Sequence, residues 1–203
     1  MGVEVVEGLN DISYPTEVLW ARAEELVKED YVPLSMLMRQ LGSPKPTIAW
    51  NLPEDELPQP ELKFLFKWWN ENRGEEMAAS PLDVDPFKLK PVLGRVAVLD
   101  ILEGGEEFKY RLYGSAIIQE PGKDLTGLLL SDIWTPLRTF FAITYRAVVL
   151  RKEPLYTRHE PHHSLKMTTW DRLILPLSSG NEVERIIVAL VPVYTSEPKP
   201  EYM

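Results

Sequence analysis

The sequence predicts an α+β fold, in which a five-stranded antiparallel sheet is flanked by helices and preceded by an N-terminal helical extension. Two observations predict it. Apolar residues follow a helical repeat up to residue 94 and alternate as in strands from residue 95 onwards. The elements after residue 95 also run in the order of two strands, short helices, one long helix and three further strands.

The composition is that of an ordinary folded protein, with 203 residues of which 44% are hydrophobic and 26% charged. No apolar run approaches the roughly 18–20 residues of a membrane-spanning helix, so we expect no membrane partner. The acidic N-terminus lacks the layout of a signal peptide, which favours a cytoplasmic location. The net charge of −9 argues against nucleic acid as a partner, because phosphate binding needs clustered Lys and Arg.

Residues 1–41 are predicted to be an acidic N-terminal helical extension. Apolar side chains recur at helical spacing over residues 15–30 and again over residues 33–41, and Gly42 is placed to end the second helix. Two short amphipathic helices must bury their apolar faces on the main domain or on a second copy of the chain. Residues 42–60 contain five prolines and are predicted to be a semi-extended linker.

Residues 61–203 hold the main domain, with its core at 95–194. A helix over residues 60–74 has a broad aromatic face that includes Trp68 and Trp69, and this face requires extensive burial. A short helix is expected between Asp85 and Gly94. The predicted strands cover residues 95–102, 107–114, 154–160, 168–177 and 183–194, and the long helix follows Thr135 and Pro136.

Several short motifs follow one another in order: "FLFKWWNENRG", "DVDPFKLKPVLG", "YRLYG", "DLTG" and "WDRLILPLSSG". In their order and spacing they resemble the PAS domain family, and in particular bacterial proteins built around a single PAS domain. The resemblance covers residues 60–194. It implies a PAS-like domain with a sensory or regulatory role in signal transduction, which binds a small ligand or a protein partner and signals in trans.

The resemblance also implies a homodimer, since PAS domains serve as dimerising signal relays. The N-terminal helices and the helix with Trp68 and Trp69 are the candidate interfaces. The chain is too short to hold a kinase, a cyclase or a DNA-binding output beside this domain. We therefore expect any signal to pass to a separate protein.

Aromatic and polar side chains on the predicted sheet and long helix are candidates for ligand binding, because ligand pockets are mostly apolar with a few placed polar groups. These candidates are Tyr110, Tyr113, Trp134, Phe140, Thr144, Tyr145, Trp170 and Arg172. The alternative for each is a place in an ordinary packed core. Arg111 lies mid-strand among apolar neighbours, so it either pairs with an acid such as Asp100 or contacts an anionic ligand.

The three histidines, His159, His162 and His163, lie in one stretch and are the weak candidates for a metal site. Pro161 opposes a helix here. In an extended chain His159 and His163 lie about 13 Å apart, too far to share one metal ion. A curled loop after Pro161 could still chelate a metal through His162 and His163, with Glu160 or Asp171 nearby, but we expect no metal.

The cofactor is unknown from the sequence, but two kinds are constrained. The chain has no cysteine, which excludes a cysteinyl-linked cofactor. Haem and flavin are not expected, because residues 135–151 offer no histidine to a haem. We also expect no catalysis, since no known catalytic motif is present. Two alternatives remain open: a small cone-like α+β enzyme using the histidine region and Asp171, and a structural adaptor without a ligand.

Overall fold

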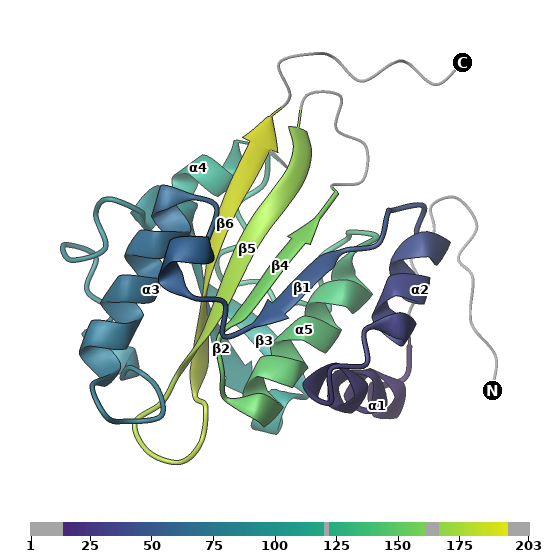
Figure 1. Cartoon of the computed structure of the whole chain (residues 1–203), viewed down its shortest axis with the longest axis horizontal. Helices are drawn as coiled ribbons and strands as arrows, with labels where there is room; N and C mark the ends of the chain where they lie inside the picture. The colour runs from purple at the N-terminus through teal and green to yellow at the C-terminus, as the bar shows by residue number, and fades with distance from the viewer. Residues whose placement is uncertain (1–13, 120–121, 161–166, 195–203) are drawn as a thin grey trace.

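A six-stranded antiparallel sheet forms the centre of the protein, with helices on both of its faces (Figure 1). This computed structural model describes residues 14–119, 122–160 and 167–194. The strands are β1 (Thr47–Trp50), β2 (Val96–Leu102), β3 (Glu107–Tyr113), β4 (Leu155–His159), β5 (Met167–Leu177) and β6 (Arg185–Tyr194). Their order across the sheet is β1-β4-β5-β6-β2-β3.

The α-helices divide between the two faces of the sheet (Figure 1). They are α1 (Thr16–Val27), α2 (Val32–Gln40), α3 (Pro60–Arg73), α4 (Ser115–Ile118) and α5 (Arg138–Arg151). Short 3-10 helices cover η1 (Glu54–Glu56), η2 (Pro81–Asp83), η3 (Leu93–Arg95) and η4 (Glu103–Gly105). Helix α3 covers one face, α5 covers the other, and α1 packs on α5.

Alternate residues of the central strands enter two separate cores. Leu155 and Ile174 pack on the side of α5, whereas their neighbours Tyr156 and Leu173 pack on the side of α3. Strand side chains point to opposite faces in turn, so a sheet covered on both sides is apolar on both faces. This two-sided burial explains the continuous apolar runs in the sequence and confirms the predicted PAS-like α+β fold.

The sheet contains one strand more than the sequence predicts. Strand β1 comes from the proline-rich segment 42–60 and pairs with β4, with Ile48 opposite Thr157. Isoleucine and tryptophan favour strands, and the prolines lie outside these four residues, where an edge strand tolerates them. The indole N–H of Trp50 also donates to the carbonyl of Leu26, 3.2 Å away, which ties this strand to α1.

The segment between Asp85 and Gly94 forms turns instead of the expected α-helix. Asp85 does accept the N–H of Phe87, at 2.8 Å, as an N-terminal cap would. The helix does not continue, because Pro91 has no N–H to extend the ladder of hydrogen bonds. The segment ends in the 3-10 turn η3.

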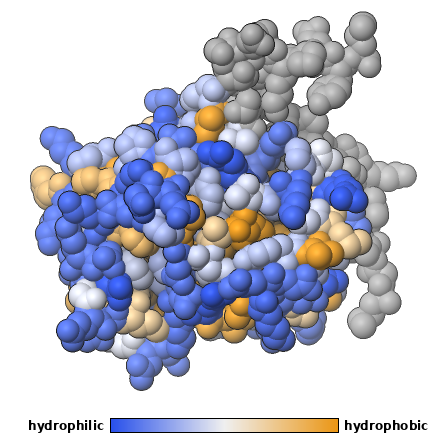
Figure 2. All heavy atoms as spheres, viewed as in Figure 1, coloured by the Kyte–Doolittle hydropathy of each residue, from blue (hydrophilic) through white to orange (hydrophobic). Residues whose placement is uncertain are grey.

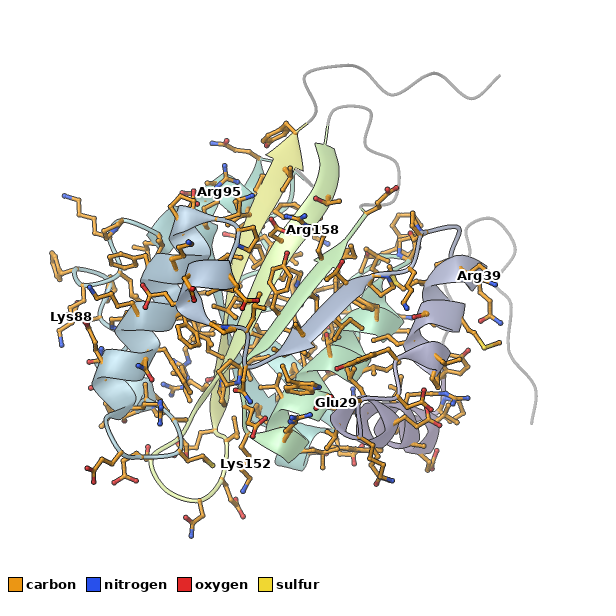
Figure 3. All side chains as sticks on the ribbon, viewed as in Figure 1. Glu29, Arg39, Lys88, Arg95, Lys152 and Arg158 are labelled. Atoms are coloured by element: carbon orange, nitrogen blue, oxygen red, sulfur yellow. The ribbon has the colours of Figure 1, made fainter. Side chains whose placement is uncertain are left out.

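The two N-terminal helices dock on the main domain. Ala23 and Leu26 of α1 and Met38 of α2 are fully buried in the same core as α5. Arg151 at the end of α5 donates to the carbonyl of Val27 and pairs with Glu29, both at 3.0 Å. Figure 3 labels Glu29 beside the end of α5. Of the two expected docking surfaces, the main domain is therefore the one that these helices use.

The aromatic face of α3 is buried within the protein and does not form an open interface. Trp68 and Trp69 are 6% and 4% exposed. The indole N–H of Trp69 donates to the carbonyl of Pro176 on β5, at 2.7 Å. The two tryptophans of this candidate interface helix therefore anchor α3 on the sheet and do not face a second copy of the chain.

In the view of Figure 2, hydrophilic residues cover most of the surface, and apolar residues show as separate patches. Leu82 and Phe87, in the turns after α3, are the most exposed large apolar side chains of the described residues, at 88% each. Among the helices in the described part of the chain, none has the length and apolar character to cross a bilayer. Several polar and charged side chains, including Thr157, His159 and Arg172, are buried inside the protein.

Candidate functional site

Three polar side chains lie together on the side of β4 and β5 that faces α5. Thr157 and His159 share this face of β4 because they are two residues apart. Thr157 is opposite Arg172 on β5, and His159 is opposite Trp170. Their exposed fractions are 0% for Thr157, 2% for His159 and 1% for Arg172. We call these three side chains the Arg172 cluster.

Aromatic rings of α5 surround the guanidinium of Arg172. Its central carbon lies 4.4 Å from the ring centroid of Phe141, 5.3 Å from that of Tyr145 and 5.9 Å from that of Phe140. The imidazole of His159 lies 5.1 Å from the ring of Phe140, measured between centroids. Cation–π contacts of this kind stabilise a desolvated cation by about 2 kcal/mol. They do not satisfy its N–H donors.

The Arg172 cluster is short of hydrogen-bond partners. All three nitrogens of the Arg172 guanidinium, both nitrogens of His159 and the hydroxyl oxygen of Thr157 are buried and have no partner among the described residues. They are six of the eight such side-chain atoms in the described part of the chain. A buried unsatisfied polar group costs about 1–3 kcal/mol, and more when it is charged. Native cores contain few such atoms, so each of these six calls for an explanation.

The electrostatics leave Arg172 as the charged member of this group. Burial, and then the charge of Arg172, hold the pKa of His159 well below its ordinary value, so the imidazole is neutral at pH 7. Burial, and then the neighbouring Tyr145, raise the pKa of Tyr110 well above its ordinary value. Burial also raises the pKa of Tyr113. Arg172 opposes both tyrosine shifts, which places its charge near both rings.

The acid next to Arg172 in sequence lies on the opposite face of the sheet. Asp171 is fully buried on the side of α3, where Arg158 donates to its two oxygens at 2.6 and 2.8 Å. Tyr156 and Gln59 donate to it as well, at 2.8 and 3.0 Å. Burial would raise the pKa of Asp171, but these hydrogen bonds lower it overall. Arg158 is labelled in Figure 3.

This arrangement separates His159 from Asp171. The two side chains point to opposite faces of the sheet, so they cannot act together as an acid–base pair. Among the described residues, no group of three or more acidic, histidine or cysteine side chains is placed to hold a metal ion. His162 and His163 lie outside the described residues, so the structure does not place them.

Most of the residues predicted to bind a ligand lie around the Arg172 cluster. The structure brings together Tyr110, Tyr113, Phe140, Tyr145, Trp170 and Arg172 in the core between sheet and α5. Thr144 is buried on α5, and its hydroxyl donates within the helix to the carbonyl of Phe141, at 3.0 Å.

Two predicted residues do not join this group. Trp134 is 65% exposed, outside the core. Arg111 pairs with Asp100 at 2.8 Å, and its side chain is 53% exposed, so the ion pair is the alternative observed.

Sequence reasoning missed Thr157, and it considered His159 as a metal ligand or as an acid–base group of an enzyme, not as part of a ligand site. The signal that identifies them is the alternation along β4, which puts Leu155, Thr157 and His159 on one face. Without the register against β5, the sequence does not show that this face meets Arg172.

A comparison with known proteins gives the family. A model of the PAS domain matches residues 58–191, well over half of the chain. The match begins just before α3 and ends within β6, so it includes β4, β5, α5 and the Arg172 cluster. The comparisons with curated proteins and with solved structures found no match. Because the match covers most of the chain and the fold agrees with it, the chain belongs to the PAS domain family.

Proposed function

We propose that this protein is a cytoplasmic PAS-type sensory or regulatory module, which binds a small molecule at the Arg172 cluster and signals to a partner protein. The observation that carries the proposal is the buried guanidinium of Arg172, whose nitrogens have no partner among the described residues. A buried charge without a partner weakens a fold. A bound ligand would supply the hydrogen-bond partners that the guanidinium of Arg172 lacks. The proposal includes no catalytic step.

A route for the signal follows from the contacts of α5. One side of this helix presents Phe140, Phe141 and Tyr145 to the Arg172 cluster. Its other contacts are with α1 and α2, which pack on it. A shift of α5 on ligand binding would therefore move the N-terminal helices, which lie outside the matched family region.

Helix α2 has an exposed apolar surface that could contact a second copy of this chain. Val32 and Met36 are 64% and 56% exposed and lie four residues apart, on one side of the helix. We propose that this side makes the homodimer. Replacing both residues by Glu should shift the mass of the full chain from dimer to monomer, as measured by light scattering. A monomeric wild-type protein, or an unchanged dimer in the double variant, would contradict this part of the proposal.

Ligand binding is tested by native mass spectrometry of the full chain, purified without added ligand. The expected result is a population that carries a small molecule, released by collisional activation. The Arg172→Met variant should show only the mass of the protein, without a bound small molecule. The control is Arg111→Met, which removes an exposed arginine and should retain the molecule. If wild-type protein carries nothing and no small molecule raises its melting temperature, the proposal fails.

A further inference from the structure

The chemistry of the Arg172 cluster specifies a class of ligand, which deepens the proposed function and rests on it. We propose that the ligand is a small monoanionic organic acid. Its carboxylate is held by Arg172, with Thr157 and His159 as neutral partners, and its apolar body lies against the aromatic side chains of α5 and β3.

The sign of the ligand follows from the charges that face the cluster. Arginine stays a cation at every physiological pH. His159 and the nearby tyrosines are neutral at pH 7, as the directions of their pKa shifts require. Asp171 is bound by Arg158 on the opposite face. The exposed Asp124 interacts with Tyr113, but no acidic side chain of the described residues is hydrogen-bonded to Arg172. The buried cluster therefore contains one positive charge and no acid bound to it.

The number of negative charges on the ligand follows from the single positive charge of Arg172. One carboxylate neutralises one guanidinium and leaves the buried site without net charge. A phosphate dianion would leave one negative charge in excess, and a neutral ligand would leave the cation unbalanced. Burying an uncompensated charge costs several kcal/mol, so the site favours a monoanion over either.

Hydrogen bonding favours a carboxylate among the monoanions. The guanidinium is a planar fork of five N–H donors that matches the two oxygens of a carboxylate. A carboxylate accepts about four hydrogen bonds in all. The hydroxyl of Thr157 and the N–H of the neutral His159 are available donors beside Arg172, since neither has a partner among the described residues.

The rest of the surroundings favours an apolar body on the acid. Phe140, Tyr110 and Tyr145 are buried next to Arg172, and their rings are the main surface that a ligand would meet. Phe141 and Trp170 are only half-buried, so the cluster approaches the surface beside these two rings. An aryl or short alkyl carboxylate fits this combination of one charge and several rings.

The inference is tested by calorimetric titration of the full chain with matched probes. Benzoate, phenylacetate and hexanoate are compared with benzamide, phenylacetamide and hexanamide, which have nearly the same shape without the charge. At least one acid should bind about 10- to 100-fold more tightly than its amide, the factor expected of a charged hydrogen bond. Phenylphosphonate, titrated at a pH where it is a dianion, should bind more weakly than the best acid.

The Arg172→Met variant separates binding from folding. It should lose the preference for acid over amide while keeping the circular dichroism spectrum of the wild type. Arg111→Met, an exposed arginine on β3, should keep the full preference. These two variants differ in the burial of the arginine that is removed and not in the substitution itself.

The possible results distinguish the inference from the proposed function. If the protein retains a neutral molecule in native mass spectrometry, or binds the amides as tightly as the acids, the carboxylate inference fails and the proposed function stands. Tighter binding of phenylphosphonate than of every acid also overturns it. If no probe binds and no molecule is retained, both fail.

Discussion

The guanidinium of Arg172 on β5 lies 4.4 Å from the centroid of the Phe141 ring on α5. This contact links the sheet to the helix that carries the N-terminal extension, and it is made by a cation that is 1% exposed. Cation–π contacts to a desolvated cation contribute about 2 kcal/mol. They offset part of the cost of burying the charge and leave its N–H groups unsatisfied. Arg172 is therefore a net cost to the stability of the ligand-free fold, which supports the proposed binding role.

The first prediction is that Arg172→Met stabilises the ligand-free protein. Replacing a buried charge that has no partner with an apolar side chain of similar length should raise the free energy of unfolding by about 1–4 kcal/mol. For a chain of this size that corresponds to a rise of about 2–4 °C in melting temperature per kcal/mol. Thermal unfolding followed by circular dichroism measures it.

Arg158→Met is the matched control for that measurement, because it removes an arginine from the neighbouring strand on the opposite face. Arg158 pairs with Asp171, which is fully buried. Its loss leaves a buried carboxylate without its main partner and should lower the free energy of unfolding by about 3–5 kcal/mol. Equal losses in both variants would mean that Arg172 is a stabilising core residue.

The second prediction concerns the pH dependence of stability. Burial, followed by the charge of Arg172, lowers the pKa of His159 in the folded state. The unfolded chain takes up a proton near pH 6.5, whereas the folded chain does so only at lower pH. Stability is therefore complete above pH 6.5 and falls as the pH drops towards the folded pKa, by up to about 1.4 kcal/mol per pH unit.

His159→Gln should reduce this fall, since glutamine does not titrate. Urea unfolding of both proteins at pH 7.5 and pH 5.5 gives the two differences, and the other titrating groups contribute to each protein alike. The charged group that faces His159 in the described residues is Arg172. An identical loss of stability in wild type and variant would show that His159 takes up its proton as readily in the folded protein as in the unfolded chain.

The strands and the long helix could be predicted from the sequence because apolar spacing reports burial directly. Strand β1 could not, since four strand-forming residues lie in a segment whose prolines dominate its composition. Its pairing depends on the free edge of β4, which is a property of the tertiary fold.

The candidate site was only partly predictable for a similar reason. Arg111 and Arg172 look alike in sequence, as arginines in the middle of apolar strands. Asp100 pairs with Arg111, on the strand next to it. Arg172 lies opposite Thr157 on one side and Leu190 on the other, neither of which is an acid. The register of the sheet decides which arginine remains without a partner, and the register is not readable from one strand.

The third prediction is that Arg151 holds the N-terminal helices on α5. Its guanidinium donates to the carbonyl of Val27 at 3.0 Å and lies 4.6 Å from the ring centroid of Trp50. Arg151→Ala removes both contacts and should lower the free energy of unfolding by about 1–3 kcal/mol. Hydrogen exchange should become faster in α1.

Glu29→Gln is the control for Arg151, because it weakens only the exposed ion pair. The side chain of Glu29 is 56% exposed, and a surface pair of this kind contributes about 0–1 kcal/mol. Exchange in α1 should stay close to that of the wild type. A larger effect from Glu29→Gln than from Arg151→Ala would assign the docking to the ion pair instead of the carbonyl and ring contacts.

The fourth prediction tests whether α1 is fixed against the turn between β2 and β3. Gly105 has a φ of +108°, and a Cβ added there would lie 2.9 Å from the indole of Trp20 on α1. Gly105→Ala should therefore displace Trp20, whose indole N–H donates to Glu106 at 3.0 Å. We expect a loss of about 1–3 kcal/mol, from the backbone strain and the displaced ring together.

Gly104→Ala separates the backbone effect from the contact with Trp20. Gly104 also has a positive φ, +69°, but a Cβ there would meet nothing within 4 Å. Its substitution should cost about 1–2 kcal/mol from the backbone alone and leave hydrogen exchange in α1 unchanged. Faster exchange in α1 for Gly105→Ala only would show that Trp20 anchors the helix. Equal exchange in the two variants would mean that α1 is held by its contacts with α5, and that a signal reaching the N-terminal helices travels through α5 and not through this turn.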